Sequence, residues 1–202
     1  MTGLAGDLFA MIYVAKESRV YALDASGKAP SGATMARPNS LGYAYKPDDW
    51  SPGSGMPFGG ILPVTVPGSI WGWKEVLRRF GTLGLRETLQ AAVDYAENGF
   101  AVSEVGAADW VLPNGLPPDP ADPRGCCTQL DPASIATWYV DGKSPRAGKW
   151  FRNPDLANTL RRLQRDRSQV FYKGKIARAV VARSLALGGT MTLDDLASYR
   201  GR

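Results

Sequence analysis

The amino-acid sequence predicts a layered α/β fold of which this chain supplies only a part. Two β-rich runs, residues 7–14 and 19–24, are separated by a short connection and predict a β-hairpin. Beyond residue 66 the chain carries several segments with apolar residues at helical spacing. Two or three strands cannot form a sheet large enough to bury that many amphipathic helices. We therefore expect an incomplete body whose other strands are missing, in preference to a free-standing small α+β domain.

The strands and the loop that follows them come first along the chain. Residues 7–14 are almost continuously apolar, which is typical of a strand covered on both faces. Residues 25–60 are rich in Gly, Pro, Ser and Asn, and this composition predicts a long loop. Residues 61–66 (ILPVTV) predict a short strand, whose proline favours an edge position. Pro67 and Gly68 then turn the strand into a helix, because proline presets φ and glycine has no side chain.

Five helices are expected, each from its apolar spacing and from a residue that starts or ends it. Asn153 before Pro154 is a typical helix start, and Thr192 with Asp195 three residues later forms a capping pair. Residues 171–174 (FYKG) predict a turn that two aromatic side chains anchor in a core. The five expected helices cover residues 67–80, 85–98, 153–163, 176–185 and 193–199.

The composition is that of an ordinary globular domain, with 44% hydrophobic and 21% charged residues. No run approaches the ~18 apolar residues that a membrane helix needs, so we expect no membrane segment. The first residues show neither a basic n-region nor an apolar h-region, so no secretion signal is recognised. The sequence is therefore compatible with a location in either the cytoplasm or the periplasm.

The net charge is +5, and most of the basic surplus lies late in the chain. A nucleic-acid interface would require these cations on one face with aromatic residues interleaved. Here they fall between apolar positions of the expected helices, which is typical of a solvated face. We therefore expect no nucleic-acid partner. The late basic residues are Arg161, Arg162, Arg165, Arg167, Lys173, Lys175, Arg178 and Arg183.

Histidine is absent from the sequence, which excludes Ser-His-Asp and Cys-His mechanisms and any histidine-metal site within this chain. The only cysteines are the adjacent pair Cys126 and Cys127, so no metal site is expected. They lie in residues 112–134, a segment rich in Pro, Asp and Gly that we expect to be a variable surface loop. A vicinal redox pair is the alternative interpretation.

Five blocks of sequence, in order along the chain, resemble the large subunit of the γ-glutamyltransferase (γ-glutamyltranspeptidase) family. The first opens with GLAGDLFAMIYV and the second with LPVTVPGSIWGW. The last three are FRNPDLANTLRRL, VFYKGKIARAVV and GGTMTLDDLASYR. The blocks cover residues 3–30, 62–104, 151–163, 170–181 and 188–200.

This resemblance implies part of a four-layer αββα sandwich of the N-terminal-nucleophile hydrolases, shared by a large and a small subunit. In such enzymes the precursor cleaves itself, and the new N-terminal threonine of the small subunit attacks an amide with its own α-amino group as base. That threonine lies well beyond the last matching block, and the family has a helical stretch before the first. We therefore expect a domain over residues 1–202 that is truncated at both ends. The resemblance implies no cofactor and no catalytic residue in this chain.

One departure from the family pattern concerns the substrate. The γ-glutamyl enzymes place an arginine shortly after the second strand, where it pairs with the α-carboxylate of the glutamyl group. The corresponding residue here is Ser26, in the sequence ASGKAP (residues 25–30), and a hydroxyl cannot form the bidentate pair that a guanidinium forms. Lys28 is the nearest cation in the sequence. Ser26 and Lys28 are thus the candidate substrate-binding residues, and the SGxAP pattern resembles the acylase and amidohydrolase branch.

The functional hypothesis is a large-subunit fragment of a γ-glutamyltransferase-like amidohydrolase, a hydrolase or acyltransferase of glutathione-like amides. Its expected partners are the small subunit of the same precursor and a small-molecule amide. Two alternatives stay open: an acylase or amidohydrolase of a non-glutamyl small amide, and a non-catalytic scaffold or binding offshoot of the family. By itself the chain is expected to be inactive.

Overall fold

The computed structural model describes residues 3–43, 55–56, 60–110, 132–166 and 169–202. The chain forms two compact units. The first comprises Met1–Thr34, Val64–Gln90 and Arg161–Arg202, and the second comprises Met35–Pro63 and Ala91–Leu160. Cys126, Cys127 and most of the expected variable loop (residues 112–134) lie outside the described residues.

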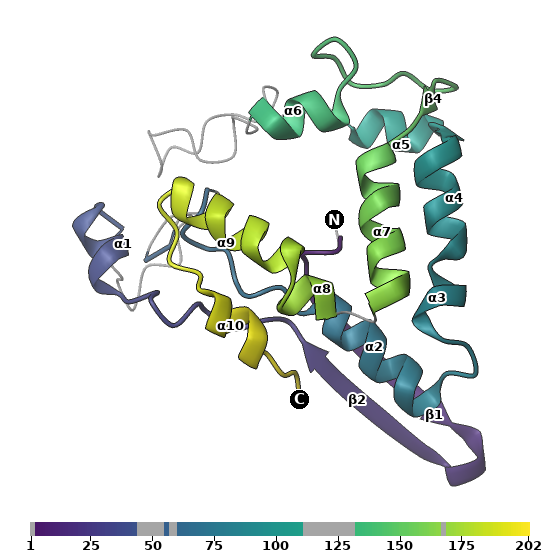
Figure 1. The fold of residues 1–202 in the computed structure, drawn as a ribbon, viewed down its shortest axis with the longest axis horizontal. Helices are drawn as coiled ribbons and strands as arrows, with labels where there is room; N and C mark the ends of the chain where they lie inside the picture. Colours follow the sequence, from purple (N-terminus) through teal and green to yellow (C-terminus); the bar gives the residue numbers. More distant parts are fainter. Residues whose placement is uncertain (1–2, 44–54, 57–59, 111–131, 167–168) are drawn as a thin grey trace. The chain divides into compact units, whose positions relative to one another are not determined.

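The first unit is built on the predicted hairpin, which the structure confirms. Strands β1 (Leu8–Val14) and β2 (Arg19–Ala25) are antiparallel, with Leu8 opposite Ala25. The short 3₁₀ turn η1 (Ala15–Glu17) joins them. Helix α2 (Ser69–Phe80) lies along the hairpin (Figure 1). The approach is close, because a side chain at Gly72 would overlap that of Leu8.

Only one face of β1 is covered within the described structure. Its residues alternate between half-buried and exposed, with Phe9, Met11 and Tyr13 on the exposed face at 69%, 81% and 63% exposure. Val20 of β2 is also exposed. The continuous apolar pattern of β1 predicted a strand covered on both faces. Within the described residues, nothing covers the face that carries Phe9, Met11 and Tyr13.

The strand expected at residues 61–66 is absent, and this prediction was wrong. The segment is irregular, and its one described backbone hydrogen bond to the loop after β2 runs from the Val66 amide to the Lys28 carbonyl at 2.9 Å. A longer ladder is prevented because Pro30 and Pro63 have no amide hydrogen to donate.

The helix predicted over residues 67–80 is confirmed as α2, which begins at Ser69 and not at Pro67. Its N-cap residue, Gly68, has no side chain that accepts a hydrogen bond. Groups distant in sequence replace the missing cap. The Gly6 carbonyl accepts from the Gly68 and Ser69 amides, and the Tyr172 hydroxyl accepts from the Trp71 amide at 3.0 Å.

The helix expected over residues 85–98 is interrupted. It forms α3 (Leu85–Thr88) and α4 (Gln90–Asn98), with a turn at Leu89. The Thr88 hydroxyl donates to the Gly84 carbonyl at 3.0 Å, and such back-bonding by threonine bends helices. Gly99 follows with φ +92°, the left-handed conformation that commonly ends a helix.

The second unit contains elements that the sequence did not predict. The short strands β3 (Phe100–Ala101) and β4 (Trp150–Phe151) are antiparallel. Helix α1 (Ala36–Ser40) lies in the segment expected to be loop throughout, so that prediction was wrong at these residues. Helices α5 (Glu104–Asp109) and α6 (Pro132–Trp138) complete the described elements of this unit, apart from most of α4 and the start of α7.

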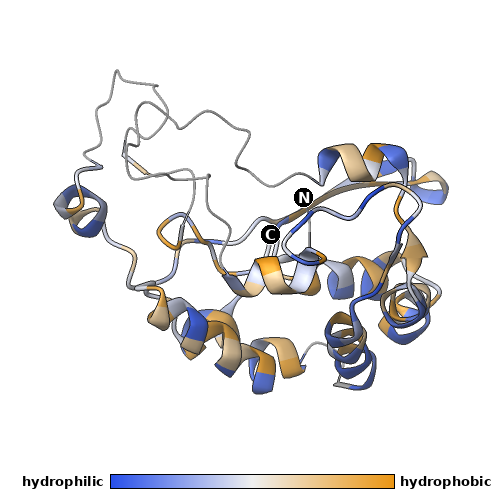
Figure 2. Cartoon of the chain, turned by 90° about the horizontal axis from the view of Figure 1, so that it is seen from above, coloured by the Kyte–Doolittle hydropathy of each residue, from blue (hydrophilic) through white to orange (hydrophobic). Residues whose placement is uncertain are grey.

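Helix α7 (Pro154–Asp166) starts as predicted, with the Asn153 side chain accepting a hydrogen bond from the Leu156 amide at 2.9 Å. Its residues Leu160 and Leu163 are buried. The helical ribbons carry both hydrophobic (orange) and hydrophilic (blue) residues, as expected of amphipathic helices (Figure 2).

The chain ends in three helices that pack together: α8 (Gln169–Tyr172), α9 (Lys175–Ala186) and α10 (Leu193–Ser198). The two aromatics of the FYKG segment are buried as predicted, but they belong to a helical turn. The predicted apolar face of α9 was wrong at Leu185, which is 56% exposed, whereas Ala177 and Ser184 are buried. In the described residues, no helix combines the length and the hydropathy that crossing a membrane requires.

Candidate functional site

The candidate site is the loop that leaves β2, residues 26–31, which we call the β2-exit loop. It carries both predicted substrate-binding residues, Ser26 and Lys28. Ser26 is half-buried and Lys28 is exposed. The Ser26 amide donates to the Asp24 carboxylate at 3.0 Å, a local turn that fixes the direction in which the loop leaves the strand. This hydrogen bond is the main reason why the pKa of Asp24 is lowered.

Gly27 allows the loop to turn sharply. Its φ of +85° is one that side-chain-bearing residues rarely adopt, and an added Cβ would overlap the Val66 carbonyl oxygen. The close approach lets the Val66 amide bond the Lys28 carbonyl, while the Gly27 amide donates to the Tyr199 hydroxyl at 3.2 Å. The backbone on both sides of Gly27 is thus held.

Asp195 anchors the far end of the loop with a buried carboxylate. One oxygen accepts from the Ser31 amide at 2.9 Å, and the other accepts from the Thr192 amide and hydroxyl at 2.9 and 2.8 Å. Burial raises the pKa of Asp195, but these hydrogen bonds outweigh it and the net pKa is lowered. The predicted capping pair is therefore confirmed, and the same carboxylate also holds the β2-exit loop.

The end of the chain completes the support. Arg202 and Asp24 exchange two backbone hydrogen bonds, at 2.7 and 2.8 Å. Tyr199 stacks on Tyr172, with ring centroids 6.0 Å apart, and meets Trp71 edge-on. Burial raises the pKa of the Tyr199 hydroxyl above its usual value.

The structure thus places Ser26 and Lys28 in one loop, whose backbone is held by Val66, Asp195 and Tyr199. The sequence analysis did not identify Tyr199 or Asp195 as anchors of this loop. A signal was available for Asp195 alone, since its role in a helix cap uses only part of the capacity of a carboxylate to accept hydrogen bonds. Among the described residues, no group of three His, Cys, Asp or Glu side chains is arranged to hold a metal ion.

Comparison with known proteins decides the family. The family model described as Gamma-glutamyltranspeptidase matches residues 1–202. This chain belongs to the γ-glutamyltranspeptidase family. The resemblance recognised in the sequence is therefore confirmed over the whole chain.

Two relatives show how much of a family member the chain represents. It is 34% identical to the oxamate amidohydrolase proenzyme of Klebsiella pneumoniae, covering 100% of this chain and 35% of that protein. It is 30% identical to the glutathione hydrolase-like YwrD proenzyme of Bacillus subtilis, covering 100% and 34%. The chain therefore spans about a third of the length of these relatives.

Solved structures confirm the predicted fold class. The cephalosporin acylase of Bacillus halodurans superposes with a TM-score of 0.82 at 30% identity, covering 99% of this chain and 34% of that one. The γ-glutamyltranspeptidase of Helicobacter pylori superposes with a TM-score of 0.76 at 26% identity, covering 98% and 52%. This γ-glutamyltranspeptidase-family chain thus has the mixed α/β fold of the corresponding part of the N-terminal-nucleophile hydrolases.

Proposed function

We propose that this chain is the large-subunit part of an N-terminal-nucleophile amidohydrolase and is active only together with a small subunit that carries a nucleophilic threonine. The observation that carries the proposal is the family match over all 202 residues. Two relatives bear the name proenzyme and are about three times as long, which supports a larger precursor here. The absence of histidine agrees with a nucleophile that uses its own α-amino group as base.

The proposed substrate is a small amide whose acyl group lacks the α-carboxylate of a γ-glutamyl group. The relatives include proteins named for oxamate, for glutathione and, among the solved structures, for cephalosporin, so the family name alone does not select one. In this proposal, the β2-exit loop discriminates between acyl groups with and without an α-carboxylate. Ser26, which is neutral, is half-buried, whereas the cation of the loop, Lys28, is exposed.

The role of this chain in the reaction is to position and select the substrate. The threonine oxygen of the small subunit attacks the amide carbonyl, the C–N bond breaks, and the leaving amine takes the proton that the α-amino group has accepted. Water then hydrolyses the acyl-threonine ester, which releases the acid and restores the threonine hydroxyl. The β2-exit loop stays in place during these steps because Tyr199, Asp195 and Val66 hold its backbone. A fixed loop presents Ser26 in one geometry, which is what substrate selection requires.

The full-length protein tests the proposal in two stages. Mass spectrometry of the purified protein should show two fragments, the smaller one beginning with threonine. The protein should then hydrolyse oxamate or a simple acyl amide faster than a γ-glutamyl anilide. A precursor that is never cleaved and hydrolyses none of these amides would favour a non-catalytic scaffold instead.

Ser26→Arg tests the substrate assignment separately. A hydrogen bond to a charged group is worth about 1.5–3 kcal/mol, so kcat/KM for the γ-glutamyl anilide should rise by about ten- to a hundredfold relative to the other amides. Ser40→Arg, an exposed serine-to-arginine change in the other unit, is the control and should alter neither rate. If the unmodified enzyme already prefers γ-glutamyl donors, and Lys28→Ala abolishes that preference, Lys28 is the carboxylate partner and the assignment is wrong.

A further inference from the structure

A second feature of the first unit has no role in the proposed reaction: an open groove of about 760 Å³ between the end of α7 and the helices α8 and α9. Among the side chains that the structure describes, its lining contains one apolar group, that of Val170, and no acidic one. The basic residues of the lining are Arg162, Arg165, Lys173, Lys175 and Arg178, and all five are exposed.

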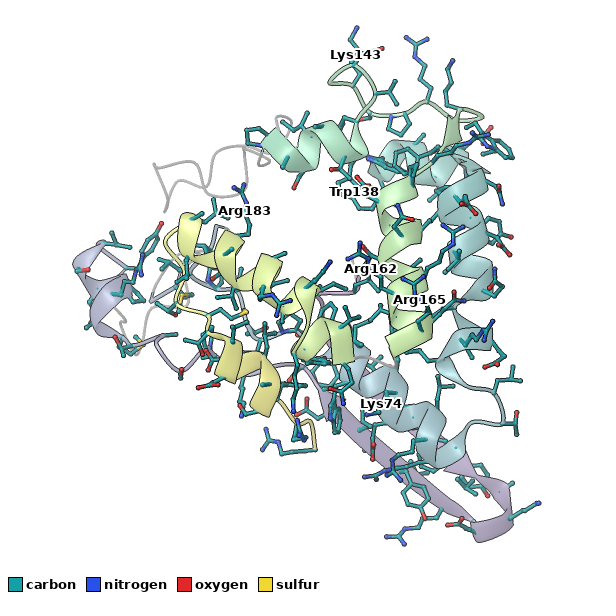
Figure 3. The ribbon with its side chains drawn as sticks, in the orientation of Figure 1. Lys74, Trp138, Lys143, Arg162, Arg165 and Arg183 are labelled. Carbon is teal, nitrogen blue, oxygen red and sulfur yellow. The ribbon has the colours of Figure 1, made fainter. Side chains whose placement is uncertain are left out.

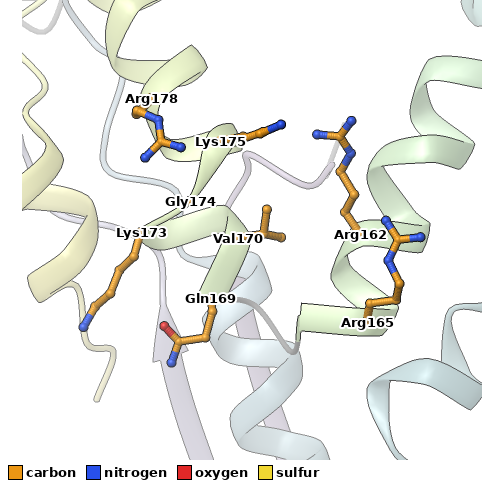
Figure 4. A pocket seen from close by; sticks show the side chains of 8 residues that line it. All are labelled: Arg162, Arg165, Gln169, Val170, Lys173, Gly174, Lys175 and Arg178. Atoms are coloured by element: carbon orange, nitrogen blue, oxygen red, sulfur yellow. The ribbon is translucent and has the colours of Figure 1, made fainter.

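The five cations line one groove, although the sequence analysis interpreted them as an ordinary solvated face. Arg162 and Arg165 lie along one side of α7 (Figure 3). Together with Lys175 of α9 they face the space between the two helices, whereas Lys173 extends away from it (Figure 4). Within the described part of the chain, none of these side chains forms an ion pair.

On α9 the positions of these charges disfavour the helix, whereas on α7 the repulsion between two cations is opposed by the favourable place of Arg165 in the last turn. Arg162 and Arg165 are three residues apart on α7, and Lys175 and Arg178 have the same spacing at the start of α9. Like charges at this spacing destabilise a helix by about 0.2–0.5 kcal/mol for each pair. The first turn of α9 also contains no acidic residue, although the positive end of a helix favours anions and disfavours cations.

Like charges that lower the stability of the folded protein are typical of binding sites when they lie on a concave surface. An anion bound between such cations is attracted to each of them, and this attraction offsets their mutual repulsion. Guanidinium groups suit phosphate and carboxylate, which they bind through two parallel hydrogen bonds. The size of the groove lies in the range of small-molecule sites, about 300–1,000 Å³. A single-stranded nucleic acid would need aromatic side chains for its bases to stack on, and the described lining residues include none.

We propose that this groove binds a small polyvalent anion, one with at least two phosphate or carboxylate groups. Arg162 and Arg165 contact one end of the anion from α7, and Lys175 with Arg178 contacts the other from α9. The site does not depend on the proposed amide hydrolysis, since none of these residues belongs to the β2-exit loop.

Titration calorimetry on the full-length protein at constant ionic strength tests the proposal, with inorganic pyrophosphate and citrate as probes. Both anions should bind saturably at one site and compete with each other. The double substitution Arg162→Glu and Arg165→Glu should weaken pyrophosphate binding at least tenfold. Arg162→Lys with Arg165→Lys should retain part of the affinity, because the charge stays but the paired hydrogen bonds are lost.

Lys143→Glu with Lys149→Glu is the matched control, with the same change in net charge on exposed side chains of the other unit. Lys143 points outward there (Figure 3). This control should change the affinity less than twofold. The proposal is overturned if the wild-type protein shows no saturable binding, or if both pairs weaken binding equally, since the effect would then be one of net charge. Tight binding of a single-stranded DNA 12-mer that pyrophosphate does not displace would indicate a nucleic-acid surface instead.

Discussion

Replacing Tyr172 by phenylalanine removes one hydroxyl group and should loosen the start of α2. The hydroxyl donates to the Pro67 carbonyl at 2.9 Å and accepts from the Trp71 amide at 3.0 Å, and burial raises its pKa so that it stays protonated. Gly68 has no side chain that accepts a hydrogen bond in its place. Each hydrogen bond contributes about 0.5–1.5 kcal/mol net, so losing both should cost about 1–3 kcal/mol.

Hydrogen–deuterium exchange of the full-length protein measures this loss where it occurs. At about 1.4 kcal/mol per tenfold change, exchange in a peptide covering residues 67–72 should accelerate by roughly five- to 150-fold. Tyr13→Phe is the control, because Tyr13 is exposed and no hydrogen bond of its hydroxyl is present among the described residues. Unchanged protection in folded Tyr172→Phe, or equal acceleration in both variants, would show that the hydroxyl does not cap α2.

Three further predictions follow from the packing and charges of the first unit. Gly68→Ala should lower the free energy of unfolding, measured in urea, by about 1–3 kcal/mol, because the added Cβ would overlap the carbonyl oxygen of Ala25. Gly3→Ala is the control: no atom lies within 4 Å of its added Cβ, so the free energy of unfolding should change by less than about 0.5 kcal/mol. Similar changes in the two variants would contradict the packing argument. The Arg78 guanidinium holds the pKa of Glu75 at about 2, against about 4.5 when unfolded, so this pairing stabilises the fold above pH 4.5 and is lost as the pH falls through 2. Glu75→Gln should therefore reduce stability at pH 7 by about 0.5–1 kcal/mol and by less at pH 3, and a constant difference would refute the pairing. The isolated chain should self-associate through the exposed apolar face of β1 and should hydrolyse no amide. Met11→Lys should reduce the self-association measured by sedimentation. A monomeric chain with a sharp cooperative melt would count against this prediction.

The sequence predicted the elements that local chemistry determines. The hairpin, the cap at Asn153 and the capping pair of Thr192 and Asp195 all depend on residues within a few positions of one another. Each was found where the sequence placed it. The family was also predictable, because its five blocks keep their order along the chain.

The incorrect predictions concern interactions that depend on tertiary context. Residues 61–66 have the composition of a strand, but the neighbouring β2-exit loop offers Val66 one carbonyl and no continuous partner strand. The break at Leu89 follows from the side chain of Thr88, which bonds back to the preceding turn. Strands β3 and β4 are two residues each, too short for any alternating pattern to reveal them.

The candidate site was predictable only in part. Ser26 was identified through its resemblance to a family position, and its neighbour Lys28 through charge. Tyr199 and Asp195 contact the loop from 172 and 164 residues away in sequence, so no local pattern showed that the loop is their partner. The basic groove was missed for a similar reason, since the spacing of cations on each helix does not show that α7 and α9 face the same space.

The exposed face of the hairpin and the β2-exit loop are connected through β2. The strand ends at Ala25, whose carbonyl lies close to Gly68, and the loop begins at the next residue. A protein layer that covers Phe9 and Met11 would therefore restrain the strand from which the loop leaves. Large exposed apolar faces of this kind usually mark interfaces in soluble proteins. In the proposed two-subunit enzyme, the same contact that buries this face would then also steady the backbone at Ser26, so assembly and substrate selection would depend on one strand.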